Sequence, residues 1–272
     1  MKHSILFTSL GLCLFSFACG SAENGATADD SATGPQWLPA VEVGEAGATA
    51  TDPTVSDEAN VVQSADEELS LSNWVVQLPD NSTTPAGTDK KPWYYSNGAS
   101  KEFADAEYGV STGHSLHCRT EMKENNHNFK ASSSNTLTVT GKVTKGSSGI
   151  TIGQVFNDSK DIPLAELQFT GKAFAVLYEE ARGKGKTHPI AASTAVGKAY
   201  TYSMSLTKGV LTVTVNGVSW STKPTSAVSS DTFYFKAGNY DQGSSANPKQ
   251  NSATVSSTIR SSVEISALTT QH

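Results

Sequence analysis

The sequence predicts an all-β fold in which two antiparallel sheets pack as a sandwich or jelly roll. Short alternating runs of polar and apolar residues recur from residue 71 onward, with turn residues between them. No segment keeps a helical period over three turns. Charged residues make up only 17% of the 272 residues, and Ser and Thr are abundant, which is typical of β-rich extracytoplasmic proteins.

The first 19 residues are organised like an export signal. A charged start at Lys2 precedes an apolar stretch over residues 5–18, which is too short to span a bilayer. Small residues surround Cys19, and the segment resembles a bacterial lipoprotein signal with Cys19 as the acylated first residue of the mature chain. An ordinary signal cleaved nearby is the alternative. We expect an exported protein, either secreted or held in the bacterial outer membrane by a lipid anchor at Cys19.

Residues 20–68 lack the large apolar residues that a core needs, so we expect a disordered acidic linker. Eleven of the 26 Asp and Glu residues lie before residue 69, where Lys2 is the only base. The remaining chain, residues 69–272, therefore carries a mild positive charge and forms the predicted folded domain. That charge favours an anionic partner. The three cysteines exclude a disulfide-stapled scaffold and a zinc ribbon.

Alternation and turn residues place individual strands in this domain. Residues 136–140 alternate and end at Gly141, and residues 173–178 follow the same pattern. Residues 200–206 and 210–215 flank Lys208-Gly209 and predict a hairpin. Asn216-Gly217 predicts the next tight turn, which leads into residues 218–220. So many antiparallel strands over about 200 residues favour two sheets, without a second folded domain or a repeat.

Three strand-like segments carry polar side chains on one face. Period two places the polar residues of the first segment together and turns Cys118 and Met122 toward the core. We expect Gly238 to leave room for something to lie against the third segment. The shared faces comprise His117, Arg119, Glu121 and Lys123 in the first segment, Gln154 and Phe156 in the second, and Tyr234, Lys236, Gly238, Tyr240 and Gln242 in the third.

A solvated sheet face explains each segment taken alone. Together they describe a groove for a carboxylated chain, because Arg, Lys, Gln and Tyr converge and Glu121 can fix the bases. The mixture of aromatic and amide side chains also suits sugar rings. We therefore expect an anionic polysaccharide, rather than a nucleic acid, as the partner of a monomeric protein.

The same segments resemble motifs of the alginate lyases of polysaccharide lyase family 7. Residues 119–124, RTEMKE, are similar to that family's RTELRE, and residues 234–242, YFKAGNYDQ, to its YFKAGxYxQ. Residues 154–156, QVF, stand where the family has QIH or QVH. Residues 71–79, LSNWVVQLP, and residues 263–272 resemble its first and last strands. The resemblance covers residues 69–272 and implies a β-jelly roll sandwich whose concave sheet holds a uronate polymer in a groove.

The resemblance implies cleavage of a 4-linked uronate by β-elimination, without a metal or another cofactor. Such a reaction removes the C5 proton and expels O4, and the neighbouring carboxylate must be neutralised first. Arg119 and Gln154 match the family's residues for that task, and Tyr240 matches its catalytic tyrosine. Tyr240 would protonate O4 and can also act as the base. We expect nearby Lys236 and Arg119 to lower its pKa by favouring the phenolate. The substrate-binding residues implied are Lys236, Lys123, Glu121, His117, Phe156, Tyr234 and Gln242.

Phe156 departs from the family pattern, because phenylalanine cannot carry a proton. In 4-linked mannuronate or glucuronate, H5 and O4 lie syn, so one tyrosine can serve both; in guluronate they lie anti, and a second group is wanted. The missing histidine therefore predicts preference for mannuronate, although His117 can substitute for it. Lys123, where the family has Arg, keeps the charge without a bidentate grip. Two alternatives stay open: a lyase for another β-1,4-uronan such as glucuronan, and a non-catalytic carbohydrate-binding jelly roll.

Overall fold

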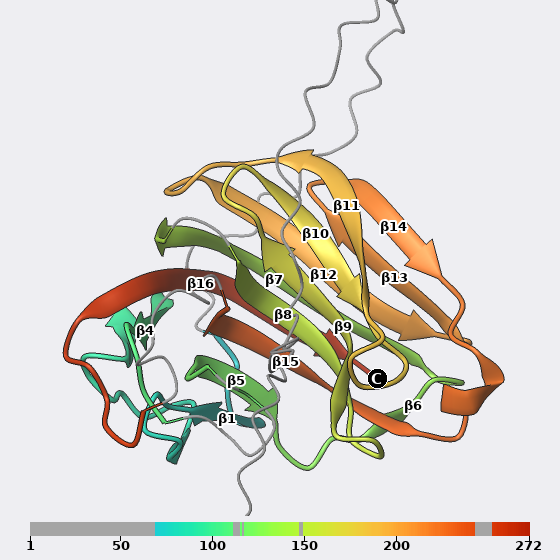
Figure 1. Ribbon diagram of the computed structural model, residues 1–272, viewed down its shortest axis with the longest axis horizontal. Coiled ribbons are helices and arrows are strands. Elements are labelled where there is room, and N and C mark those ends of the chain that lie inside the picture. The colour runs from blue at the N-terminus through green and yellow to red at the C-terminus, as the bar shows by residue number, and fades with distance from the viewer. Residues whose placement is uncertain (1–68, 111–114, 116, 147–148, 243–251) are drawn as a thin grey trace, which may run out of the picture. The chain divides into compact units, whose positions relative to one another are not determined.

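Antiparallel strands and one short 3₁₀ turn at Ser226–Val228 account for the regular structure of the described residues (Figure 1). The computed structural model describes residues 69–110, 115, 117–146, 149–242 and 252–272. The predicted signal over residues 1–19, with Cys19, and the predicted linker over residues 20–68 lie outside the described residues. None of the described residues forms a helix long and apolar enough to cross a membrane.

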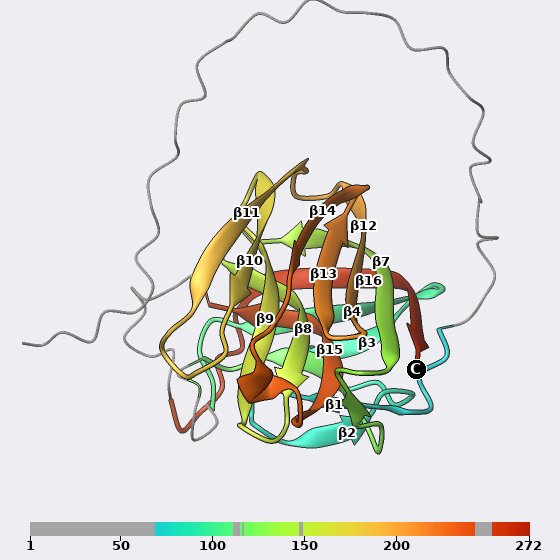
Figure 2. The ribbon, with the colours of Figure 1, turned by 90° about the vertical axis from the view of Figure 1, so that its right-hand side faces the viewer.

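The first sheet has nine strands in the order β11-β10-β9-β8-β15-β5-β1-β2, and β6 pairs with β15 (Figure 1 and Figure 2). These strands are β1 (Trp74–Gln77), β2 (Thr83–Pro85), β5 (Thr120–Glu124), β6 (Phe129–Lys130), β8 (Ile150–Asn157), β9 (Ile162–Phe169), β10 (Ala173–Tyr178), β11 (Lys186–Ser193) and β15 (Thr232–Asp241). All pairings are antiparallel. The first polar segment thus ends on β5, and the other two lie on β15 and β8, with β15 paired between β5 and β8.

The second sheet has seven strands in the order β14-β13-β12-β7-β16-β4-β3. These strands are β3 (Tyr94–Asn97), β4 (Ser100–Ala106), β7 (Ser134–Lys145), β12 (Ala199–Thr207), β13 (Val210–Val215), β14 (Val218–Thr222) and β16 (Ile259–Gln271). Both predicted tight turns are confirmed, and their residues have positive φ, which the primed hairpin turns require. The φ angles are 51° and 74° at Lys208 and Gly209, and 48° and 82° at Asn216 and Gly217.

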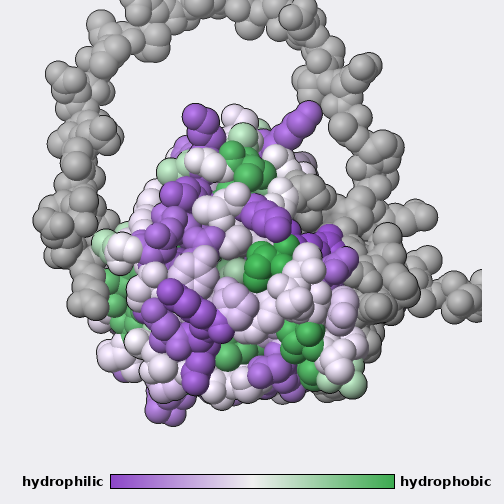
Figure 3. Space-filling model, turned by 90° about the vertical axis from the view of Figure 1, so that its left-hand side faces the viewer, coloured by the Kyte–Doolittle hydropathy of each residue, from purple (hydrophilic) through white to green (hydrophobic). Residues whose placement is uncertain are grey.

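The core lies between the two sheets and contains the alternate apolar residues of their strands. Val155 and Phe235 from the first sheet and Val139 and Met204 from the second are at most 1% exposed. Tyr202 of β12 crosses this layer and donates a hydrogen bond from its hydroxyl to the carbonyl of Ile152 in β8, at 2.8 Å. This bond ties the second sheet to β8. Outside the core, the face in Figure 3 shows small hydrophobic spots separated by hydrophilic side chains.

Three local expectations need correction. The strand predicted to end at Gly141 runs on to Lys145, because it stays paired with β16 beyond that residue. The first polar strand begins at Thr120 rather than at His117. Gly238 does not leave room for a ligand: with φ at 140°, an added Cβ would lie 2.9 Å from the Cα of Glu121. Its missing side chain lets the backbone of β5 approach where the register between β15 and β8 shifts.

Candidate active site

Register between three neighbouring strands brings the polar segments together. Lys236 of β15 lies opposite Lys123 of β5 on one side and opposite Gln154 of β8 on the other. Tyr234 of β15 lies opposite Phe156 of β8. Period two turns these side chains to the outer face of the first sheet, because Phe235 and Ala237 between them are fully buried in the core, as predicted.

A pocket of about 270 Å³ opens on this face. Seven of the predicted site residues line it: Arg119, Lys123, Gln154, Phe156, Tyr234, Lys236 and Tyr240. They are joined by Gln77, Ser115, Asp161, Pro163, Glu166 and Arg182. Cationic side chains, carboxylates, amides and phenols therefore surround one small volume, a combination suited to binding a carboxylate and moving a proton beside it.

The buried carboxylate of Glu121 holds three polar side chains of the pocket in place. It is 2% exposed, and its Oε2 atom lies 3.3 Å from Arg119 Nη1 and 3.3 Å from Lys236 Nζ. Its Oε1 atom accepts a hydrogen bond from the amide of Gln154. Both oxygens of Glu121 are thus used to hold the bases and the amide, in the role expected for it. Arg119 Nε is buried and has no hydrogen-bond partner among the described residues.

Tyr240 lies between a cation and a hydroxyl. The Arg119 guanidinium is 3.9 Å from the centre of its ring, and its hydroxyl is 2.6 Å from Ser115 Oγ. Burial raises the pKa of Tyr240 to about 12, and the charge of Arg119 opposes this increase without cancelling it. The expected lowering of this pKa is therefore wrong for the unliganded protein, because desolvation of a phenolate in the pocket outweighs the nearby cation.

Aromatic rings and ammonium groups alternate at the other end of the pocket. Tyr234 and Phe156 stack with centroids 5.1 Å apart. Lys123 Nζ lies 4.6 Å from the Tyr234 ring, and Lys236 Nζ lies 4.5 Å from the Phe156 ring. Phe156 thus presents an apolar surface to one of the pocket's cations. Burial lowers the pKa of Lys236 to about 8, and the charge of Glu121 opposes this decrease.

The other residues singled out from the sequence do not line the pocket. The ring of His117 lies 6.3 Å from that of Tyr240, and burial lowers the pKa of His117. Gln242 donates hydrogen bonds to Thr151 and Glu166 instead of facing the pocket. Cys118 is 1% exposed, and burial raises the pKa of its thiol, as befits a core residue rather than a nucleophile.

Comparison with known proteins decides the family. The sequence model described as alginate lyase matches residues 69–272. The chain belongs to the alginate lyase family. It is a polysaccharide lyase of that type, as the motifs on β5 and β15 implied. No curated protein sequence matches it.

Solved alginate lyases have the same fold as this family member. Alginate lyase A1-II′, a member of polysaccharide lyase family 7, is 23% identical, with 75% of this chain and 96% of that chain covered and a TM-score of 0.65. Alginate lyase PA1167 from Pseudomonas aeruginosa is 21% identical, with 74% and 99% covered and a TM-score of 0.65. The exolytic alginate lyase AlyA5 from Zobellia galactanivorans is 13% identical, with 74% and 95% covered and a TM-score of 0.60. The β-jelly roll expected from the sequence is confirmed.

Six residues that line the pocket of this alginate lyase family member were not predicted from the sequence. Ser115 lies in a loop with no regular pattern, and Asp161 and Arg182 flank strands rather than belong to them. Glu166 had a usable signal, since it is the only charged residue in the apolar strand β9, IPLAELQF. It lies opposite Gln154 in the register with β8 and is 5% exposed.

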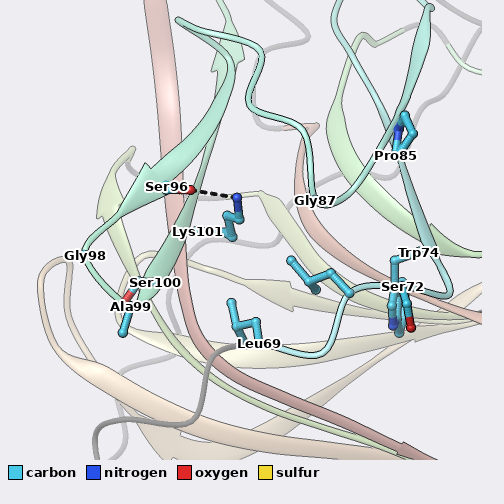
Figure 4. Close-up of a pocket in the computed structure, with 11 residues that line it drawn as sticks. Leu69, Ser72, Trp74, Pro85, Gly87, Ser96, Gly98, Ala99, Ser100 and Lys101 are labelled. Carbon is cyan, nitrogen blue, oxygen red and sulfur yellow. Dashed lines mark hydrogen bonds between the residues drawn. The ribbon is translucent and has the colours of Figure 1, made fainter.

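A second, larger cavity lies apart from these groups. It has a volume of about 560 Å³ and is lined by residues of β1, β2, β3, β4 and their loops (Figure 4). Lys101 is its charged residue, and the ammonium group is bound to Asp89 at 2.9 Å and to Ser96 at 2.7 Å. No described tyrosine, histidine or carboxylate lines this larger cavity, so it lacks a group suited to moving a proton, and the smaller pocket is the candidate active site.

Proposed function

We propose that this alginate lyase family member cleaves alginate by β-elimination, prefers mannuronate, and releases oligosaccharides with an unsaturated end. The observation that supports the reaction is the convergence of Arg119, Gln154 and Tyr240 on one pocket. The substrate class is supported by relatives, since A1-II′ variants have been crystallised with a product, GGG, and with a substrate, GGMG.

The pocket's residues divide the work of the reaction. Arg119 and Gln154 bind the carboxylate of the sugar that loses its C5 proton, and so stabilise the charge that develops on it. Tyr240 donates its phenolic proton to the leaving O4, a role that suits a phenol whose pKa is about 12. The Tyr234–Phe156 pair offers a surface on which a neighbouring sugar ring can stack.

Preference for mannuronate is proposed because Phe156 stands where a histidine is typical of the family. Initial rates on purified poly-mannuronate, poly-guluronate and glucuronan should rank poly-mannuronate first, with the ultraviolet absorbance of unsaturated product as the readout. Phe156→His should raise the rate on poly-guluronate selectively. A clear preference of the unmodified protein for poly-guluronate contradicts the syn argument. If glucuronan is cleaved fastest, the natural substrate is another β-1,4-uronan rather than alginate. If the protein binds a uronan but forms no product, it is a non-catalytic carbohydrate-binding module.

Deprotonation of Lys236 should weaken the binding of anionic substrate at alkaline pH. Its folded-state pKa of about 8 lies below the usual lysine value, so the ammonium group loses its proton above pH 8 in the free protein. We expect kcat/KM to fall above about pH 8, mainly through a higher KM. Lys236→Arg, which stays protonated, should move this limb to higher pH. An alkaline limb at the same pH in that variant would assign it to another group.

Export belongs to the proposal as well. It is supported by the composition of residues 1–19, with Cys19 as the site of a lipid anchor or an ordinary signal as the alternative. A monomer acting on an extracellular polymer fits this location. Mass spectrometry of the mature N-terminus distinguishes the two signals, because acylation adds the mass of the lipid chains to Cys19.

A further inference from the structure

Glu121 and Glu166, two of the carboxylates in the site region, differ in how their oxygens are used. Both oxygens of Glu121 are bound by Arg119, Lys236 and Gln154, so this carboxylate positions those side chains. Glu166, which lines the pocket, concentrates its bonds on Oε2 alone. That atom accepts hydrogen bonds from the Thr151 hydroxyl at 2.8 Å, from Gln168 Nε2 at 3.3 Å and from Gln242 Nε2.

The remaining oxygen of Glu166 is the atom available for chemistry. The hydrogen bonds that described residues donate to Glu166 all go to Oε2 and none to Oε1, although Glu166 is only 5% exposed and lines the pocket. Three donors on Oε2 favour the ionised carboxylate and leave Oε1 as the atom that can take up a proton. A carboxylate fixed at one oxygen and open at the other is arranged as a positioned base rather than as a structural group.

Glu166 lies close to the proposed proton donor. Thr151, which binds Glu166, lies opposite Tyr240 in the register between β8 and β15. Gln242, two residues after Tyr240, binds both Thr151 and Glu166. The charge of Glu166 also contributes to the raised pKa of Tyr240. The two side chains thus reach one pocket from the same sheet face, on strands separated only by β8.

The protonation state of Tyr240 means that the elimination needs a separate base. With a pKa raised to about 12, Tyr240 is almost entirely the neutral phenol at pH 8, so little phenolate is present to act as a base in the free protein. Phe156 cannot take a proton. When H5 and O4 lie on the same side of the sugar, an acid and a base on the same face of the sheet can act together.

We propose that Glu166 is the base of the elimination and Tyr240 is its acid. The C5–H bond breaks and its proton goes to Glu166 Oε1. The electron pair of that bond forms the C4–C5 double bond, the C4–O4 bond breaks, and O4 takes the phenolic proton of Tyr240. Proton exchange with solvent then restores Glu166 as carboxylate and Tyr240 as phenol. This assignment rests on the proposed uronate elimination.

The charges around Glu166 are compatible with this role. Burial raises its pKa, and the charge of Glu121 adds to the increase. Arg119 and Lys236 are the cations whose pKa values respond to its charge. A base with a raised pKa is stronger than an ordinary carboxylate and is ionised only above that pKa, so kcat should fall on the acid side as Glu166 is protonated.

Glu166→Gln tests the assignment on whichever uronan the unmodified protein cleaves. We expect kcat to fall at least about 10²-fold with KM changed by less than about threefold, because the amide keeps the shape but accepts no proton. Glu180→Gln is the matched control. Glu180 is a carboxylate outside the pocket that accepts hydrogen bonds from Thr225 and Tyr178, and its variant should keep kcat.

The outcomes separate this inference from the proposed function. No unsaturated product from the unmodified protein overturns the elimination itself. Product from the unmodified protein together with a kcat within about threefold in Glu166→Gln overturns the role of Glu166 alone. If the amide variant does not fold, Glu166→Asp is used, since it keeps the charge and withdraws the acceptor. It should lose at least about tenfold in kcat while keeping the acid limb, and unchanged kcat there overturns the assignment.

Discussion

Tyr240→Phe is expected to lower kcat by at least about 10²-fold while leaving substrate binding largely intact. The substitution removes the hydroxyl proposed to donate a proton to O4 and keeps the ring that packs against the Arg119 guanidinium. Steady-state kinetics on the preferred uronan provide kcat and KM separately. The change should appear in kcat, because the phenolic proton is transferred only in the transition state.

Ser115→Ala is the matched control for this prediction. It removes the hydrogen bond to the Tyr240 hydroxyl but leaves the proton itself in place, so its effect on kcat should be much smaller than that of Tyr240→Phe. Turnover like that of the unmodified protein in Tyr240→Phe would exclude Tyr240 from the mechanism. Equal losses in both variants would mean that the hydroxyl pair acts as a unit.

Glu121→Ala is expected to cost about 3 kcal/mol of unfolding free energy and to abolish most activity. Glu121 is the buried counter-ion of two cations, and removing one partner of a buried ion pair leaves the other charge uncompensated. Urea unfolding at neutral pH measures the loss. The cost should shrink as the pH rises above 8, since Lys236, already lowered to a pKa of about 8, then loses the charge that Glu121 compensates.

Lys142→Ala is the comparison for that measurement. Lys142 pairs with Glu264 at 2.9 Å, but its side chain is 36% exposed, so breaking this pair should cost less than about 1 kcal/mol. A Glu121→Ala variant as stable as Lys142→Ala would mean that water in the pocket already screens the cluster.

Local patterns account for what the sequence predicted well. The turns at Lys208-Gly209 and Asn216-Gly217 depend on residues that tolerate positive φ, so they could be located without knowing the partner strands. Period two likewise placed Lys236 and Tyr240 on the outer face, because the side-chain direction in a strand depends only on counting. The alternation of side chains does not reveal what each residue does, and those chemical roles were inferred from the family motifs.

The errors and omissions have a non-local origin. The pKa of Tyr240 depends on how deeply β15 is covered, which no segment of sequence encodes by itself. Gly238 faces the backbone of β5, more than a hundred residues earlier, so the reason for its missing side chain was not visible in its own strand. Glu166 stands beside Gln154 only after β8 and β9 pair with an irregular register.

The order of β5, β8 and β15 along the chain has a consequence for the time at which activity appears during folding. Arg119, Gln154 and Tyr240 are far apart in sequence, yet β15 must insert between β5 and β8 before they meet. Pairings of such long range are slow to form, typically over milliseconds to seconds, because loop closure precedes any stabilising contact. No early hairpin contains the three residues, so a partly folded chain has no working pocket. The chain therefore becomes catalytically active only late in folding, after β15 has paired with both β5 and β8.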